Sequence, residues 1–140
     1  MDKMDKMDKN GKVIIYWDKD PKKLDIFKEY FIFNNKIEGY FKFYYRGNKI
    51  AHSKYFIDNK IEGEAQTYYN NGMLCELIYN NNNKYNGDYK KYHINGHIAE
   101  TCNFINGKIE GKYNFFRESG ELSSTYKYLD GKIQMPKFNT

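Results

Sequence analysis

Apolar and polar residues alternate over short stretches of this chain, and each stretch stops at a cluster of Asn, Asp or Gly. In residues 39–62, one stretch carries rings at Phe41 and Tyr44, the next begins at Ile50, and Gly47-Asn48 separates them. Alternation with a period of two is typical of a strand with one wet face, and a Gly/Asn pair between two such stretches is typical of a hairpin turn. The pattern therefore predicts β-hairpins.

The hairpin pattern repeats without a change in length. Glycine opens each copy, at Gly39, Gly63, Gly87 and Gly111, with a spacing of 24 residues. A fixed period of this size indicates a repeat architecture, in which neighbouring units stack because no unit buries its own apolar face. We therefore expect an all-β fold, in which tandem 24-residue β-hairpins form an elongated, twisted antiparallel sheet. The four regular units are 39–62, 63–86, 87–110 and 111–134.

Equivalent places in the four units carry similar residues. The sixth place is aromatic, the twelfth is aliphatic and the thirteenth is small, so Cys75, at a thirteenth place, is interpreted as a packed side chain rather than a nucleophile. Each unit has two turns. The first, Asn71-Gly72 in the second unit, predicts a type I′ turn with positive φ at both central residues. The second turn precedes a lysine in every unit.

Both ends of the chain depart from the repeat. Residues 1–9, MDKMDKMDK, are expected to be a disordered leader, and residues 135–140 a short tail. Residues 10–38 are expected to be a degenerate N-terminal capping repeat, with Ile15 at the place of the opening glycine. Two patterns compete in this unit. Asp20-Pro21 ahead of Leu24 and Phe27 could start a short helix, whereas the aromatic run at 30–33 favours a hairpin.

The motif Gly-x-Tyr-x-x-Tyr-Tyr-x-Asn-Gly-x-Leu, followed by Tyr-x-Asn-Gly-Lys, resembles the bacterial variant of the MORN repeat, a family often labelled as the antitoxin component of toxin–antitoxin modules. The resemblance covers about residues 10–134 and implies an elongated ribbon of hairpins. It also implies an antitoxin or immunity role, as in some members, or a role as a protein scaffold or membrane-associated module, as in related MORN repeats. It brings no catalytic residues. The chain departs from the pattern at Ile15 and at 80–83, where polar residues interrupt a strand end.

Composition agrees with a sheet and leaves the class of partner open. The chain is 40% hydrophobic and 19% aromatic, with only two prolines. A net charge of +5 permits an anionic partner, but the 23 basic residues are interleaved with 18 acidic ones, which is typical of an ordinary solvated surface. Cys75 and Cys102 form no CxxC motif, and neither a signal peptide nor a membrane-spanning apolar run is visible. We therefore expect a cytoplasmic protein with free thiols.

Two residue pairs carry candidate chemistry. Glu76 and Glu100 occupy the same place in neighbouring units, about 10 Å apart, a separation at which two carboxylates could flank a sugar bond. Repeat spacing alone produces such pairs, however. His93 and His97 flank a turn and could begin a metal site, but no third ligand has a defined place. We therefore expect no catalytic residue, no metal, no cofactor and no enzymatic activity.

Aromatic residues are the stronger functional signal. A sheet one layer thick cannot bury both faces, and exposed rings favour protein interfaces or, beside basic residues, stack on nucleobases. Lysines recur beside each strand end and could form a basic edge, which Glu38, Glu62 and Glu110 should partly neutralise. The candidate interface is Tyr40, Phe41, Phe43, Tyr45, Tyr69, Tyr89 and Tyr113, and the candidate basic edge is Lys36, Lys60, Lys84, Lys108 and Lys132.

Three functional hypotheses follow from these features. The first is a non-enzymatic protein-binding module that inhibits a partner protein, such as a toxin or another enzyme, in an antitoxin or immunity role. The second is binding of single-stranded nucleic acid, including inhibition of a nucleic-acid-guided enzyme. The third is a scaffold associated with anionic membranes. The open edges of a hairpin ribbon also predict that a homodimer can form.

Overall fold

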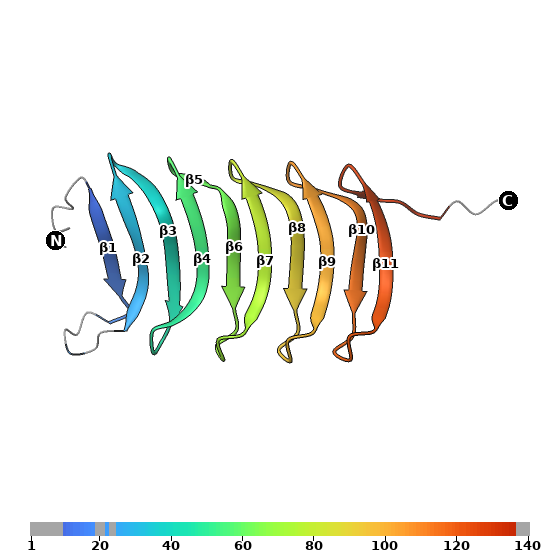
Figure 1. Ribbon diagram of the computed structural model, residues 1–140, viewed down its shortest axis with the longest axis horizontal. Coiled ribbons are helices and arrows are strands. Elements are labelled where there is room, and N and C mark those ends of the chain that lie inside the picture. Colours follow the sequence, from blue (N-terminus) through green and yellow to red (C-terminus); the bar gives the residue numbers. More distant parts are fainter. Residues whose placement is uncertain (1–9, 19–21, 23–24, 137–140) are drawn as a thin grey trace.

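The protein is a single open sheet of hairpins laid side by side (Figure 1). The computed structural model describes residues 10–18, 22 and 25–136. Within them the sheet has 12 antiparallel strands, whose spatial order follows the sequence, and contains no helix, so the all-β prediction is confirmed. No helix of the described residues is long and apolar enough to cross a membrane. The strands are β1 (Gly11–Tyr16), β2 (Ile26–Phe33), β3 (Lys36–Tyr45), β4 (Lys49–Ile57), β5 (Lys60–Ile61), β6 (Gly63–Tyr68), β7 (Leu74–Asn81), β8 (Lys84–Tyr92), β9 (Ile98–Ile105), β10 (Lys108–Phe116), β11 (Leu122–Leu129) and β12 (Lys132–Ile133).

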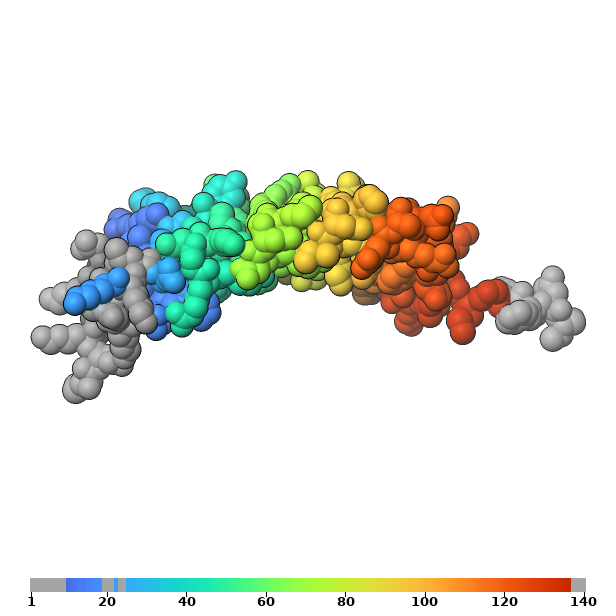
Figure 2. All heavy atoms as spheres, turned by 90° about the horizontal axis from the view of Figure 1, so that it is seen from below, coloured from blue at the N-terminus to red at the C-terminus, as the bar shows by residue number. Residues whose placement is uncertain are grey.

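The ribbon is long in the direction in which the hairpins add, and it bends along that direction (Figure 2). Between the edge strands β1 and β12, each strand pairs with its neighbours in sequence, except that β5 pairs only with β4 and β6 therefore pairs with β4 and β7. Contacts are therefore made between neighbouring hairpins, as expected for a repeat protein. The predicted leader and most of the predicted tail, residues 1–9 and 137–140, lie outside the described residues.

The two edges of the ribbon carry different turns. At one edge two residues with positive φ join consecutive strands, as at Asp58 (φ 54°) and Asn59 (φ 66°), which is the geometry of a type I′ turn. At the other edge Gly47 (φ 79°) and Asn48 (φ 58°) both have the positive φ that was predicted, but the prediction of a type I′ turn is wrong at Asn71-Gly72. The Tyr69 N–H donates to the Met73 carbonyl at 2.8 Å, so three residues form the loop, and of Asn71 and Gly72 only the glycine has positive φ. A type I turn followed by a left-handed glycine produces this geometry.

The first hairpin, β1 and β2, corrects the expected repeat phase. Gly11 pairs with Ile32 as Gly39 pairs with Phe56, so Gly11, and not Ile15, holds the place of the opening glycine. The phase is displaced because the connection is longer: Trp17 N–H donates to the carbonyl of Asp25, eight residues on, instead of four. Residues 19–21 and 23–24, where a helix was the alternative, lie outside the described residues.

The two faces of the sheet differ in burial. One face, here called the core face, carries Ala65, Ile78 and Cys102, whose exposed fractions are 6–8%. In the strand pairing Ala65 lies opposite Ile78, and Tyr89 lies opposite both Ile78 and Cys102. Its rings pack across hairpin boundaries, as in the stacked pair of Tyr30 and Phe41, whose centroids are 4.6 Å apart. The opposite face, here called the open face, carries the pair Tyr40 and Tyr55 and is more exposed. Ring packing on one face therefore holds the ribbon together.

Candidate functional site

Each junction between hairpins contains a bulge at its opening glycine. Between β4 and β6, Ser53 pairs with Gln66, and the Glu62 N–H donates to the carbonyl of Tyr55 at 2.9 Å. One residue of β4 therefore faces three residues of the next strand, beginning with Gly63, whose φ is +71°. Left-handed backbone of this kind favours glycine, which explains why glycine recurs at this place. The bulge interrupts the ladder and leaves a hollow beside it on the open face.

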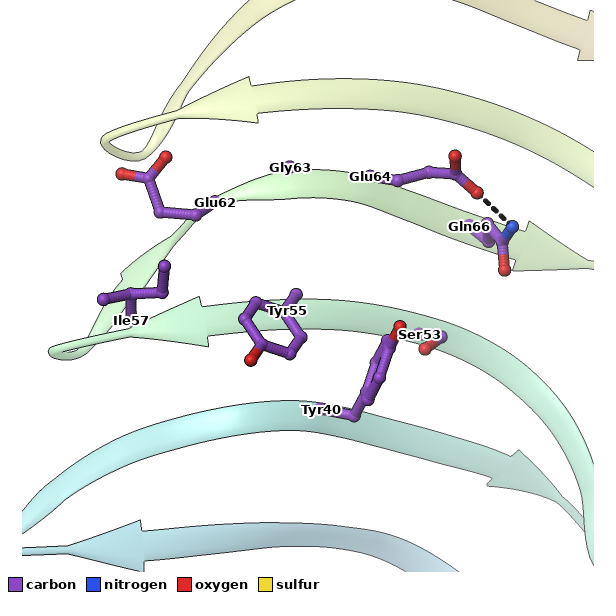
Figure 3. Close-up of a pocket in the computed structure, with 8 residues that line it drawn as sticks. All are labelled: Tyr40, Ser53, Tyr55, Ile57, Glu62, Gly63, Glu64 and Gln66. Carbon is purple, nitrogen blue, oxygen red and sulfur yellow. Dashed lines mark hydrogen bonds between the residues drawn. The ribbon is translucent and has the colours of Figure 1, made fainter.

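Two of these hollows lie on either side of one aromatic pair. Tyr40 and Tyr55 face each other edge-on across β3 and β4, with centroids 5.0 Å apart and ring planes at 80° (Figure 3). The hollow on one side, about 510 Å³, also contains Ile57, Glu62 and Glu64 among its walls. The hollow on the other side is about 560 Å³ and is lined partly by residues of β2. The pair thus forms a ridge between two depressions, and side chains of a partner can fit into these depressions.

Exposed apolar side chains extend this ridge along the first two hairpins, β1–β2 and β3–β4. We call these residues the open-face patch. Within the patch, the largest exposed fractions are those of Tyr40 and Phe33 (57% each) and Ile57 (52%). Large apolar side chains that gather on one face, with polar residues at the rim, mark interaction surfaces. The open-face patch consists of Phe31, Phe33, Tyr40, Tyr55 and Ile57.

A polar cluster borders the patch on the open face. Glu29 accepts a hydrogen bond from the Tyr44 hydroxyl at 2.6 Å and forms an ion pair with Lys12 at 2.6 Å. Both bonds lower the pKa of Glu29, and the bond from Lys12 has the larger effect. Burial, and then the bond to Glu29, raises the pKa of Tyr44. Because Lys12 and Glu29 also line the hollow beside Phe31, the cluster fixes one wall of that depression.

The rings predicted as an interface do not form one exposed surface. Tyr40 is exposed on the open face, but the other six are half-buried. The hydroxyls of Tyr45 and Tyr69 donate to backbone carbonyls of the following hairpin, at 2.8 and 2.6 Å. The remaining four, Phe41, Phe43, Tyr89 and Tyr113, pack against rings of the core face.

Sequence reasoning missed four residues of the open-face patch. They are Phe31, Phe33, Tyr55 and Ile57, and each pair lies two residues apart on one strand, β2 or β4. Period-two spacing places both members of a pair on the same face. That spacing was the available signal, but it does not reveal which face of the sheet is the buried one.

The predicted basic edge exists as a row of exposed lysines, but acidic residues are set between them. Lys36, Lys60, Lys84, Lys108 and Lys132 each follow a two-residue turn at one edge. Lys36 forms an ion pair with Asp58, and Lys108 pairs with Asp130 at 2.7 Å. Exposed pairs of this kind weaken the field that a row of lysines would otherwise produce.

The glutamates expected to neutralise this edge act differently. Glu62 accepts a hydrogen bond from the Asn82 N–H at 2.7 Å, and Glu38 and Glu110 accept the equivalent bonds from the following turns at 2.8 and 2.7 Å. Each carboxylate therefore satisfies a backbone donor of the next hairpin. Their role is to connect the turns of successive units.

Glu76 and Glu100 are part of a structural ladder on the core face. Tyr89 donates its hydroxyl proton to Glu76 at 3.1 Å, and Tyr113 donates to Glu100 at 2.6 Å. Lys91 also approaches Glu100, at 3.4 Å. Burial first, then the neighbouring glutamates, raise the pKa of both tyrosines. Each carboxylate thus connects its own hairpin to the next.

The histidines bond to backbone carbonyls of the following hairpin. His93 Nε2 lies 2.8 Å from the carbonyl oxygen of Phe116, and His97 Nδ1 lies 2.6 Å from that of Glu118. Because a carbonyl only accepts, each of these nitrogens carries a proton. Among the described residues no group of three or more His, Cys, Asp and Glu could hold a metal ion.

Both cysteines are free thiols, and Cys102 is buried. Burial, together with the nearby charge of Glu100, raises the pKa of Cys102 to about 11. A thiol with so high a pKa is a poor nucleophile near neutral pH.

Comparison with known proteins found no matching family model, and no curated protein matched the chain in sequence.

Proposed function

We propose that this chain is a non-enzymatic, protein-binding repeat module whose open-face patch docks on a partner protein and inhibits it, in an antitoxin or immunity role. The observation that carries the proposal is the group of exposed apolar side chains, four rings and Ile57, over the first two hairpins. The resemblance of the repeat to the bacterial MORN variant supports the same class of function, and we assign the chain to that variant as part of the proposal.

The shape and the composition of the patch suit a protein partner. Tyr40 and Tyr55 are aromatic residues of the kind that supply most of the binding energy in protein interfaces. They lie on strands, so little conformational freedom is lost on binding. Lys42, whose Nζ lies 5.7 Å from the Tyr40 ring centroid, and Glu62 provide a charged rim. An apolar centre with a polar rim is the usual anatomy of such interfaces.

A capture experiment tests the proposal. The protein, immobilised, is exposed to an extract of the cells that produce it, and retained proteins are quantified for the natural chain and for the double variant Tyr40→Lys, Ile57→Lys. We expect one protein retained in near-stoichiometric amount by the natural chain and lost, by at least tenfold, with the double variant. Two lysines remove the apolar centre without touching the core face.

Asn103→Lys is the matched control. Asn103 is exposed on the open face in β9, and Lys127 occupies the same place one hairpin later, so the repeat tolerates lysine there. The control should retain the partner as the natural chain does. Retention of the same protein by the double variant would contradict the proposal, as would the absence of any stoichiometric partner.

A further inference from the structure

The second regular hairpin lacks the rings that fill the core face elsewhere. Ala65, Thr67 and Asn80 stand where the preceding hairpin has Phe41, Phe43 and Phe56. The following hairpin again has rings, Tyr89 and Phe104, at two of these places. The difference leaves a hollow of about 480 Å³ between two ring-bearing hairpins. Its apolar floor includes Ala65 and Ile78, which are each 6% exposed.

Asn80 gives this hollow a polar feature that packing does not explain. The residue is 6% exposed and lines the hollow, between Gly63 and Tyr85 in the strand pairing. None of the hydrogen bonds among the described residues involves its side-chain amide, and no fully buried side-chain nitrogen or oxygen atom there lacks a partner, so the amide atoms remain accessible from the hollow. An accessible amide without a protein partner is available to a ligand that has a matching donor and acceptor. An apolar ring from a neighbouring hairpin could not form these hydrogen bonds.

The charged residues around the hollow favour an anion. Lys54 and Lys84 line it from two neighbouring hairpins, and so does His52, which is hydrogen-bonded to Thr67 at 3.1 Å. The single carboxylate, that of Glu76, already accepts the hydroxyl proton of Tyr89. Positive charge therefore exceeds negative charge at the rim.

We propose that the hollow binds a nucleotide, with the base in the place of the missing rings and the phosphate near Lys54 and Lys84. The planar base fits the gap over Ala65, its hydrogen-bonding edge meets the amide of Asn80, and Tyr85 offers a ring against which it packs. An asparagine amide has the donor and the acceptor that a base edge requires. The same chemistry is presented by a free nucleotide and by a nucleotide within a single strand.

This site is independent of the proposed protein-binding function, because the two lie on opposite faces of the sheet. The open-face patch includes Tyr40 and Ile57, whereas the hollow has Ala65 and Ile78 on its floor. Loss of one function by substitution should therefore leave the other intact.

The test is an NMR titration of the ¹⁵N-labelled full chain with AMP, CMP, GMP and UMP, with ribose 5-phosphate, and with single-stranded decamers of DNA and RNA. We expect saturable shifts at Ala65, Thr67, Ile78 and Asn80 for at least one base. Ala65→Phe installs the ring that Phe41 provides one hairpin earlier, and it should weaken binding at least tenfold. Lys54→Gln should weaken binding and flatten its dependence on salt.

The matched control is Asn103→Tyr, which adds a ring to the open face at a place where Tyr55 and Tyr79 stand in other hairpins. It should bind as the natural chain does. A mononucleotide that binds identifies a free-nucleotide site, and binding of decamers alone identifies a single-strand site; both support the proposal.

Three results would overturn the proposal. The first is no binding of any mononucleotide at 5 mM, roughly five thousandfold above a dissociation constant of about 1 μM, and none of either decamer. The second is undiminished binding by the Ala65→Phe variant. The third is ribose 5-phosphate binding as tightly as the nucleotides, which would indicate anion binding without a base. If Ala65→Phe instead weakened capture of the partner protein while no nucleotide bound, the hollow would receive a partner side chain.

Discussion

The hydrogen bond between Tyr44 and Glu29 should make a measurable, pH-dependent contribution to the free energy of unfolding. Tyr44→Phe removes one hydroxyl and keeps the ring, so the change isolates the 2.6 Å bond to the Glu29 carboxylate. The Glu29 side chain is 14% exposed and keeps its ion pair with Lys12 after the substitution. The variant therefore loses one charge-assisted bond in a site largely shielded from water.

The expected loss at pH 7 is about 1–2 kcal/mol in the free energy of unfolding. Hydrogen bonds to charged groups are worth about 1.5–3 kcal/mol. We expect a loss near the low end of that range because the Glu29 carboxylate keeps its ion pair with Lys12. The folded-state pKa of Glu29 is lowered, so its contribution is present above the unfolded-state value of about 4.3 and is lost as pH falls through the folded-state pKa. In acid the difference should shrink to the roughly 0.5–1 kcal/mol of a neutral bond.

Urea unfolding followed by tryptophan fluorescence measures this difference. Trp17 is the only tryptophan, and its Nε1 donates to the Tyr44 carbonyl at 3.2 Å, so the signal reports on the first hairpins. Tyr92→Phe is the control: Tyr92 occupies the same place two hairpins later, its hydroxyl has no bond to a described carboxylate, and Phe116 stands there in the last hairpin. An effect of Tyr44→Phe that equals that of Tyr92→Phe, or that does not shrink as Glu29 becomes protonated in acid, would refute the reasoning.

Two further predictions concern the bulges and the thiols. Gly63→Ala should cost about 1–2 kcal/mol in urea unfolding, the usual penalty of left-handed backbone, because nothing lies within 4 Å of the added methyl group. Gly87→Ala should cost more, since its φ is +119° and the methyl group would lie 3.3 Å from Tyr79 Cβ; the reverse order would contradict the bulge interpretation. Iodoacetamide at pH 8 should modify Cys75 well before Cys102, whose pKa of about 11 leaves roughly one thiol in a thousand ionised; equal rates by mass spectrometry would contradict this.

The repeat and its strands could be predicted from the sequence because their causes are local. Alternation along each strand and Asn, Asp or Gly at each turn specify hairpins without reference to distant residues. The turn type at Asn71-Gly72 was predicted wrongly for a related reason. It depends on the pairing of Tyr69 with Met73, and the turn dipeptide alone does not specify how many residues the strands leave between them.

The first hairpin shows a second limit of the sequence pattern. A longer connection between Trp17 and Asp25 displaces the repeat phase, so counting 24 residues back from Gly39 reaches Ile15 instead of Gly11. Strand pairing restores the correct place. A fixed period therefore locates glycines only where every connection has the same length.

The candidate surfaces could be predicted only in part. The density of rings around Tyr40 indicated an aromatic surface, but rings on both faces were grouped together because the sequence does not tell which face is packed. The hollow beside Asn80 was visible in sequence only as an interruption of the apolar strand end. A hollow forms there because rings of the hairpins on either side surround the missing ones, and such contacts between units cannot be read from a single repeat.

The most direct test of the account is whether the partner covers the open face of the first hairpins. Methyl cross-saturation in the complex with the captured protein compares Ile57, in the open-face patch, with Ile78, on the floor of the core-face hollow. We predict strong saturation of the Ile57 methyl groups and none above background at Ile78. Saturation of Ile78 without Ile57 would contradict the claim that this protein binds its partner through the open-face patch.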